Sequence, residues 1–154
     1  MLLKELYRAE TGEDLPEIRT TDRGKPYFPD SGWYFSISHT PKHAFCVLSR
    51  HNVGLDAEEL DRAVNPKLAE RILSDSEYAQ YEKAPDQNRA LLTFWVLKEA
   101  AAKLSGEGLK AVMGKTALSL TDPRVQTMAG CLVAVVTEDG RNTMIQMKER
   151  NYAV

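Results

Sequence analysis

Two groups of residues, far apart in this chain, carry acidic side chains that can bind a divalent cation. Asp56 and Glu58 stand two apart in a segment with strand character, so their side chains share one face. Glu99 and Lys103 stand four apart in a segment with helical character, so they are neighbours on the helix surface. If the strand and the helix pack together, three carboxylates and one ammonium group meet. Such a set suits a divalent cation that holds a phosphate.

A plainer explanation exists for each group. Glu99 and Lys103 can form an ordinary ion pair on a helix surface, worth only about 0.3–0.5 kcal/mol. Residues 58–61 can form an acidic loop that leaves the strand. Against the loop, apolar residues alternate with polar ones right up to Asp56. Two acidic side chains on one strand face also repel each other without a counter-ion, so the pattern favours the metal site.

Ser38 and His39 stand at the end of another strand pattern. A histidine in that place can hold a phosphate through its ring N–H or act as an acid or base. A plain hydrogen-bonding role is the simpler alternative. The sequence contains no His/Cys spacing typical of zinc, no Gly-x-Ser-x-Gly and no Walker-type phosphate loop.

Composition limits the classes of protein to consider. The chain has 154 residues, of which 43% are hydrophobic, enough for one domain or two small lobes. A net charge of −2 provides no overall basic field for nucleic acid. The longest apolar run, residues 131–136, is far shorter than a membrane span of roughly 20 residues. Cys46 and Cys131 stand in apolar runs and are expected to be buried thiols, so we predict a soluble cytoplasmic protein that uses neither membrane nor nucleic acid.

The order of the predicted elements indicates an α+β fold, because strands come first, helices follow and strands end the chain. A short helix opens the chain at residues 2–9, and a turn at 22–26 leads into an extended piece. We expect a compact antiparallel set from the first strands, 33–38, 44–48 and 53–58. Helical stretches begin at residues 65, 74 and 86, the last running to about Leu104. The final predicted strands are 112–120, 130–137 and 143–148.

Four short motifs, taken in order, resemble the signature of one family. The chain is similar to the 4′-phosphopantetheinyl transferases of the surfactin-synthetase-activating type, and the resemblance runs from about Leu2 to the last strands. The motifs are Gly24-Lys25-Pro26, Phe35-Ser36-Ile37-Ser38-His39-Thr40, Val53-Gly54-Leu55-Asp56-Ala57-Glu58, and Phe94-Trp95-Val96-Leu97-Lys98-Glu99-Ala100 with Lys103 and Gly106-Glu107-Gly108-Leu109.

This resemblance implies a fold of two unequal, pseudo-symmetric lobes with antiparallel sheets and a long helix. Residues 1–52 would form a shortened N-terminal lobe, and residues 53–154 a C-terminal lobe that carries the metal site. Coenzyme A and Mg²⁺ would bind in the cleft between the lobes, with Mn²⁺ as an alternative ion. Family members usually carry a further segment before the part matched here, including a strand. We therefore expect an exposed apolar edge and self-association into a homo-oligomer.

The resemblance also implies roles for single residues. Asp56, Glu58 and Glu99 match the metal ligands, and Lys103 matches the lysine that contacts the pyrophosphate. Glu77 matches a recurring acidic position without a defined role. The positions matched to coenzyme binding are Gly24, Lys25 and Pro26 at the adenine end, Ser38 and His39 near the 3′-phosphate, and Lys98 before the metal-binding glutamate.

The implied reaction is Mg²⁺-dependent transfer of the 4′-phosphopantetheine arm of coenzyme A to a serine of an apo acyl or peptidyl carrier protein, releasing adenosine 3′,5′-bisphosphate. Glu99 and Lys103 would be the catalytic residues, with Glu99 or a metal-bound water beside it as the base. Basic residues near Lys103 and Lys110 would dock the carrier. Two alternatives stay open: a coenzyme- or carrier-binding relative without turnover, and a metal-dependent phosphohydrolase.

Overall fold

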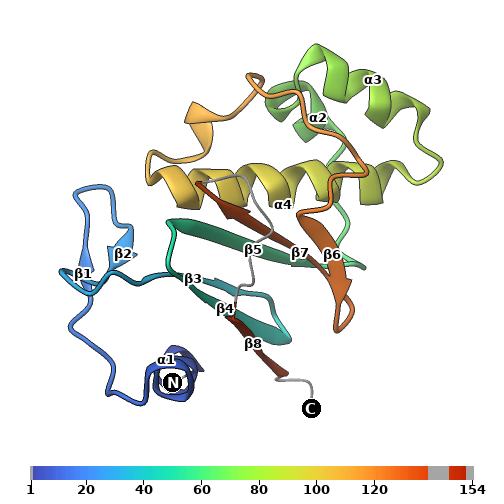
Figure 1. Cartoon of the computed structure of the whole chain (residues 1–154). Helices are drawn as coiled ribbons and strands as arrows, with labels where there is room; N and C mark the ends of the chain where they lie inside the picture. The colour runs from blue at the N-terminus through green and yellow to red at the C-terminus, as the bar shows by residue number, and fades with distance from the viewer. Residues whose placement is uncertain (1, 139–145, 152–154) are drawn as a thin grey trace.

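Two three-stranded antiparallel sheets adjoin each other, and the long helix α4 (Gln87–Ser105) lies across one of them (Figure 1). The fold is described from a computed structural model for residues 2–138 and, as backbone only, for residues 146–151. One three-stranded sheet has the strand order β3-β4-β8 and the other β5-β7-β6, and β1 and β2 form a separate two-stranded sheet. The structure confirms the predicted combination of helices and antiparallel sheets. Within the described residues, no helix has both the length and the hydropathy that crossing a bilayer requires.

The bounds of the elements agree with the prediction for most of the chain. The helices are α1 (Leu2–Thr11), α2 (Lys67–Ile72), α3 (Asp75–Lys83), α4 (Gln87–Ser105) and the short 3₁₀ turn η1 (Leu109–Ala111). The strands are β1 (Arg19–Thr20), β2 (Pro26–Tyr27), β3 (Tyr34–His39), β4 (His43–Ser49), β5 (Val53–Glu59), β6 (Val125–Met128), β7 (Cys131–Thr137) and β8 (Gln146–Asn151).

Local signals set the ends of α4. The Asp86 side chain accepts a hydrogen bond from the backbone N–H of Arg89 at 3.0 Å, and Gly106 closes the helix in the left-handed conformation with φ 72°. Between these ends the helix is apolar on two sides. Leu92, Val96, Leu97 and Ala100 pack against β7, and a second set that includes Phe94 packs against α2 and α3. The helix is therefore held between the sheet and the small helices.

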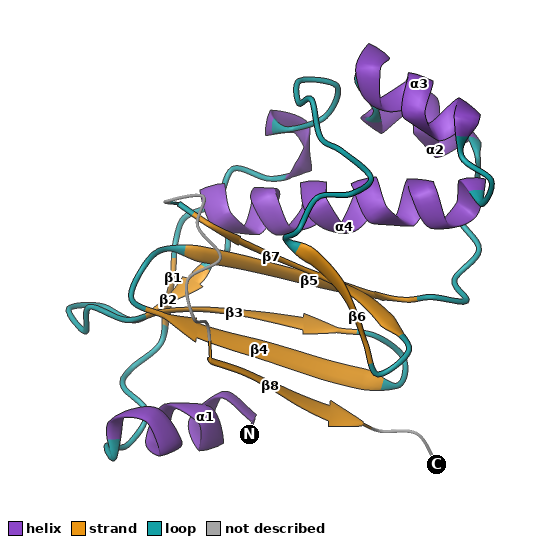
Figure 2. Cartoon of the chain, turned by 45° about the vertical axis from the view of Figure 1, so that its right-hand side comes forward, coloured by secondary structure: helices purple, strands orange, loops and turns teal. Residues whose placement is uncertain are grey.

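The helix α1 covers the opposite side of the strands (Figure 2). Leu3, Leu6 and Tyr7 of α1 form one buried cluster with Phe35 of β3 and Cys46 of β4. A second cluster joins the inner face of β4 to the faces of β5 and β7 that point away from α4. The sheets thus share a continuous interior between α1 and α4.

The expected three-stranded set of β3, β4 and β5 is wrong in its third member. β5 pairs with β7 along Val53–Glu59, whereas β4 pairs with β3 and β8. β3 and β5 still lie side by side, but serine side chains join them in place of a backbone ladder. The Ser36 hydroxyl accepts from the backbone N–H of Leu55 and the Ser38 hydroxyl from that of Ala57, each at 3.0 Å. The side chains of β3 therefore fix its position against β5.

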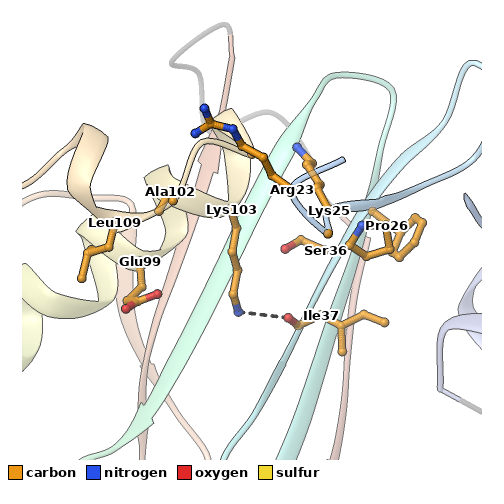
Figure 3. Close-up of a pocket in the computed structure, with 13 residues that line it drawn as sticks. Arg23, Lys25, Pro26, Ser36, Ile37, Glu99, Ala102, Lys103 and Leu109 are labelled. Atoms are coloured by element: carbon orange, nitrogen blue, oxygen red, sulfur yellow. Dashed lines mark hydrogen bonds between the residues drawn. The ribbon is translucent and has the colours of Figure 1, made fainter. Parts of the chain in front are cut away.

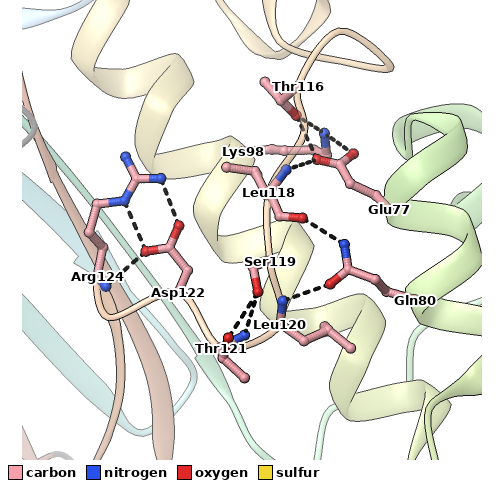
Figure 4. A network of polar contacts seen from close by, with 10 residues as sticks. All are labelled: Glu77, Gln80, Lys98, Thr116, Leu118, Ser119, Leu120, Thr121, Asp122 and Arg124. Atoms are coloured by element: carbon pink, nitrogen blue, oxygen red, sulfur yellow. Dashed lines mark hydrogen bonds and ion pairs between the residues drawn. The ribbon is translucent and has the colours of Figure 1, made fainter.

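The strand predicted at residues 112–120 is also wrong. Side chains of α3 occupy the backbone groups that a neighbouring strand would bind. Gln80 accepts from the N–H of Leu120 and donates to the carbonyl of Leu118, and Glu77 accepts from the N–H of Leu118 (Figure 4). Because these groups are satisfied by side chains, the segment runs as an ordered loop against α3 and α4.

β6 was not predicted, and its turn explains why. Ala129 and Gly130 join β6 to β7 with φ angles of 53° and 78°, and a positive φ at both central residues is typical of a tight hairpin. Alanine seldom occupies such a position, so the sequence carries no hairpin signal there. Of the strand predicted at 143–148, residues 143–145 lie outside the described residues and the remainder begins β8.

Gly54 allows α4 to lie directly on β5. A Cβ atom at this position would stand 1.9 Å from the carbonyl oxygen of Ala100 and 2.7 Å from the backbone nitrogen of Leu104. Such distances are impossible for a real side chain, and backbone atoms of a helix cannot move aside singly. A glycine is therefore required for this approach of strand and helix.

We expect Gly54→Ala to lower the free energy of unfolding by about 3 kcal/mol, because α4 must move away from β5. The measurement is urea unfolding, with Gly12→Ala as the matched control. Gly12 has a φ of 75° but no atom within 4 Å of an added Cβ, so its cost is backbone strain alone, about 1 kcal/mol. A smaller loss at Gly54 than at Gly12 would contradict the close approach.

Candidate active site

A pocket of about 340 Å³ opens between the β1–β2 turn, β3 and the C-terminal part of α4 (Figure 3). Its walls are partly apolar, and several of its polar groups are basic. The residues that line it are Arg23, Gly24, Lys25, Pro26, Phe35, Ser36, Ile37, Glu99, Ala102, Lys103, Gly106, Gly108 and Leu109. The pocket thus brings the predicted turn 24–26 together with Glu99 and Lys103.

Lys103 connects the pocket with the acidic residues of β5. Its ammonium nitrogen lies 3.1 Å from the carbonyl oxygen of Ile37 in the pocket wall and 3.4 Å from Oδ1 of Asp56 (Figure 3 shows the first contact). The side chain of Lys103 is 34% exposed, whereas that of Asp56 is 10% exposed. The ammonium group of Lys103 therefore lies between the pocket and the buried carboxylate of Asp56.

The surroundings of Asp56 disfavour the negative charge of its carboxylate. Burial raises its pKa to about 7; Lys103 opposes this shift, while the negative charges of Glu58 and Glu99 add to it. Ser38 donates to Oδ1 at 3.3 Å, but Oδ2 is buried and has no hydrogen-bond partner within the described structure. A buried acceptor in that state costs roughly 1–3 kcal/mol. Oδ2 is therefore a buried oxygen that a ligand could bind.

Glu58 lies on the same face of β5 and is held by two donors. Its Oε1 accepts from the indole N–H of Trp95 on α4 at 3.1 Å and from the guanidinium group of Arg62. Glu99, one helical turn from Trp95, has a raised pKa because of burial; Lys103 and Arg62 oppose the shift, and the charge of Glu58 adds to it. The negative charge of Glu58 therefore acts on both Asp56 and Glu99.

A comparison with protein families identifies the superfamily of this chain. The sequence model of the 4′-phosphopantetheinyl transferase superfamily matches residues 52–149. The chain belongs to this superfamily. The match includes Asp56, Glu58, Glu99 and Lys103, and it begins after the turn 24–26.

Individual phosphopantetheinyl transferases are also similar to this chain. It is 33% identical over 128 residues to the 4′-phosphopantetheinyl transferase HetI of a Nostoc strain, covering 76% of this chain and 54% of the relative. It is 32% identical over 94 residues to the 4′-phosphopantetheinyl transferase gsp of Aneurinibacillus migulanus, covering 60% of this chain and 39% of the relative. The chain thus spans about half the length of these transferases or less.

Not every residue expected at the coenzyme site of a phosphopantetheinyl transferase lines the pocket. Ser38 contacts Asp56 and β5, so its hydroxyl supports the acidic residues. His39 is exposed at the end of β3, outside the residues that line the pocket. Lys98 points to the other side of α4, where its ammonium group is fully buried. Ser38, His39 and Lys98 are therefore not among the residues that line the pocket.

Lys25 has a positioning role that its motif did not reveal. Its ammonium nitrogen donates to the carbonyl of Leu104 and to Oδ1 of Asn52, both at 2.7 Å, and Asn52 donates to the same carbonyl at 2.9 Å. Burial lowers the pKa of Lys25, and Glu138 opposes the shift. A cation on the last carbonyls of a helix is favoured by the helix dipole, so Lys25 fixes the β1–β2 turn to the end of α4.

Lys98 and Glu77 form a fully buried ion pair behind the site (Figure 4). Lys98 Nζ lies 2.8 Å from Glu77 Oε1, and neither side chain is exposed. Thr116 accepts from Lys98 at 2.6 Å and donates to Glu77 Oε2 at 2.8 Å. Glu77 also completes the predicted capping box with Ser74. The pair thus connects α3, α4 and the loop after η1. Lys98 therefore has a structural role here and no contact with the pocket.

We expect Lys98→Met to lower the free energy of unfolding by about 3–5 kcal/mol, because the buried carboxylate of Glu77 loses its counter-charge. Urea unfolding measures the change. Arg19→Met is the matched control, since it breaks an exposed pair with Glu17 and should leave the urea midpoint nearly unchanged. Equal midpoints for the two variants would argue against the buried pair.

The raised pKa of Asp56 predicts a pH dependence of stability. The carboxyl group holds its proton more tightly in the folded chain, at about 7, than at its ordinary value of 3.8. Tighter binding of this proton in the folded chain stabilises the fold. The stabilisation is complete below pH 3.8 and is lost as the pH rises through about 7. The side chain of Asp56→Asn cannot lose a proton. Between pH 4 and pH 8 the free energy of unfolding should therefore fall less for this variant than for the wild-type chain, and the two falls should differ by as much as about 4 kcal/mol. Urea unfolding without divalent cations measures this, and parallel pH profiles would contradict it.

Proposed function

We propose that this chain transfers the 4′-phosphopantetheine arm of coenzyme A to a serine hydroxyl of an acyl or peptidyl carrier protein. The observation that carries the proposal is the position of Lys103, which contacts the pocket wall at Ile37 and the carboxylate of Asp56. A substrate in the pocket would thereby meet positive charge and carboxylates at one end. Relatives named as 4′-phosphopantetheinyl transferases support the same reaction.

The pocket fits the nucleotide part of coenzyme A in size and chemistry. Its volume of about 340 Å³ falls in the usual range of small-ligand sites, roughly 300–1,000 Å³. Phe35, Ile37 and Leu109 offer apolar contacts for a base, and Arg23 and Lys103 offer positive charge for phosphates. Arg23 is held by the carbonyl of Glu107 at 3.1 Å. We propose that the phosphates lie toward Lys103 and the base toward the β1–β2 turn.

The acidic residues fit a Mg²⁺ ion, with Mn²⁺ as an alternative. Carboxylate oxygens are the ligands that Mg²⁺ takes in proteins, usually together with substrate phosphates and water. The unpartnered Oδ2 of Asp56 and the mutual repulsion among Asp56, Glu58 and Glu99 are the features that such an ion would relieve. When bound, it would neutralise negative charge that develops on the pyrophosphate during transfer.

The residues of the chain then have separate tasks in the reaction. The serine oxygen forms a bond to the β-phosphorus of coenzyme A, the bridging P–O bond breaks, and adenosine 3′,5′-bisphosphate leaves with those electrons. Glu99 takes the serine proton, since burial raises its pKa toward the range in which a carboxylate works as a base. Lys103 offsets charge on the departing bisphosphate. Trp95 and Arg62 orient Glu58.

The two-lobe arrangement of the family, with a boundary between residues 52 and 53, also stays a proposal. The chain has two three-stranded antiparallel sheets, which support this proposal. Most strands of one sheet come before the boundary, and the strands of the other come after it. β8 is the exception, because it belongs to the second segment and pairs with β4 of the first. A C-terminal strand would then complete the N-terminal sheet.

We expect Glu99→Gln to fold normally and to slow transfer by at least about 100-fold, because the amide cannot accept the serine proton. The assay mixes the protein with coenzyme A, Mg²⁺ and an apo carrier protein, and the mass of the carrier reports the transfer. Glu82→Gln, the same change on an exposed face of α3, is the matched control. Full activity of Glu99→Gln would refute the role of this residue.

The same assay separates the alternatives. A carrier heavier by one phosphopantetheine group supports the transferase. Binding of coenzyme A without a change in the mass of the carrier would identify a binding relative without turnover. Release of adenosine 3′,5′-bisphosphate without any carrier present would identify a phosphohydrolase.

A further inference from the structure

We propose that His43, Glu59 and Cys131 form a second metal site, for a transition-metal ion such as Zn²⁺, on the other side of β5 from the acidic residues. One ligand atom from each of the three residues lies within 4.8 Å of the others, and all three side chains are buried. Imidazole, carboxylate and thiolate are the ligands that Zn²⁺ takes in proteins. Nothing in the proposed transfer reaction uses these residues.

The sheet topology places the three residues together. His43 is the first residue of β4, Glu59 the last of β5 and Cys131 the first of β7. Glu59 and Cys131 are direct partners in the β5–β7 ladder, so their side chains share one face. Strand ends from both sheets therefore meet at this point. A metal ion bound there would join the two sheets.

The alternation of β5 separates this site from the candidate active site. Asp56 and Glu58 point toward α4, whereas Glu59 points toward β4 and the interior that the two sheets share. The neighbours Glu58 and Glu59 thus belong to different polar groups. An ion at one position would not share a ligand with an ion at the other.

The distances suit a tetrahedral ion. Nδ1 of His43 lies 3.0 Å from Oε1 of Glu59 and 3.5 Å from Sγ of Cys131. Zn²⁺ bond lengths in a tetrahedron place a nitrogen and an oxygen ligand about 3.3 Å apart, and a nitrogen and a sulfur ligand about 3.6 Å apart. Only small side-chain shifts would be needed. Three protein ligands leave the fourth position of the tetrahedron for a water molecule.

Surrounding contacts hold the ligands in place. The Thr40 hydroxyl donates to Oε1 of Glu59 at 2.6 Å and accepts from the backbone N–H of His43 at 2.9 Å. Hydrogen bonds that orient a ligand in this way are typical of metal sites. The turn that joins β3 to β4 passes over the residues and is exposed at Pro41 and Lys42. Local opening of this turn provides a path for the ion.

Without an ion, the three side chains satisfy one another. Burial raises the pKa of Glu59, but hydrogen bonds from Thr40, His43 and Cys131 together bring it below its ordinary value. A metal ion would take the place of the protons that His43 and Cys131 share with Glu59, while the Thr40 hydrogen bond would stay. The imidazole of His43 would then carry its proton on Nε2, and the thiol proton of Cys131 would go to solvent. The test must therefore distinguish a metal site from a closed hydrogen-bonded group.

Cobalt is the probe of choice, because a bond between Co²⁺ and a thiolate gives a charge-transfer absorption in the near ultraviolet. The intact chain, freed of metal with a chelator, is titrated with Co²⁺. We expect this absorption together with the strong visible bands of tetrahedral Co²⁺, both saturating at one ion per chain and both removed by Zn²⁺. The carboxylates of the active site cannot produce the charge-transfer absorption, since they contain no sulfur.

Matched variants locate the ligand. Cys46→Ser removes the other cysteine, which lies in the cluster beneath α1, and should keep the absorption. Cys131→Ser should abolish it, and Glu59→Gln should weaken Co²⁺ binding at least about tenfold. Asp56→Asn should lose transfer activity but keep the absorption, so the failure of one proposal is distinguishable from that of the other.

Circular dichroism establishes that each variant is folded. No charge-transfer absorption in the folded wild-type chain, or in the folded Cys46→Ser chain, would overturn the metal site. An absorption that persists in Cys131→Ser would do the same. In these cases the three side chains form a hydrogen-bonded group alone.

Discussion

The approach of α4 to β5 at Gly54 is the contact on which the candidate active site depends. The carbonyl of Ala100 occupies the space that a side chain at position 54 would fill, so the helix lies directly on the strand at this point. Asp56 and Glu58 then follow Gly54 on the same strand face, while Glu99 and Lys103 stand on either side of Ala100. A side chain at position 54 would therefore push α4, with Glu99 and Lys103, away from Asp56 and Glu58.

The carboxylates beside α4 reduce the stability of the fold. Asp56 is buried and Glu58 and Glu99 are half-buried, and burial raises the pKa of two of them, Asp56 and Glu99. Ser38, Lys103 and the donors around Glu58 offset part of the repulsion, but one oxygen of Asp56 has no partner within the described structure. The buried pair of Lys98 and Glu77 differs from it, since every charge there has a close partner. The two groups lie on opposite sides of α4. The carboxylates adjoin the pocket, whereas the pair of Lys98 and Glu77 is fully buried.

Local patterns allowed much of this structure to be predicted. The ends of α4, the capping box of α3 and the shared face of Asp56 and Glu58 follow from spacings of two to four residues, and these were predicted correctly. The errors concern contacts between distant segments. The loop at 112–120 has strand-like residues but binds side chains of α3, and Lys98 stands next to Glu99 but points the other way. Neither fact is encoded in a short motif.

β5 illustrates why the sequence neighbours of a site need not share its role. Glu58 and Glu59 are adjacent acids at the end of one strand, and a motif treats them as one acidic run. The pleat sends Glu58 to Trp95 on the helix and Glu59 to His43 on the neighbouring sheet. The end of β5 is therefore held on both faces of the strand, by α4 on one face and by β4 on the other. Because Glu59 fixes the strand end against β4 and β7, it also helps to fix Glu58 beside the other carboxylates, so the interior of the two sheets contributes to the geometry of the active site.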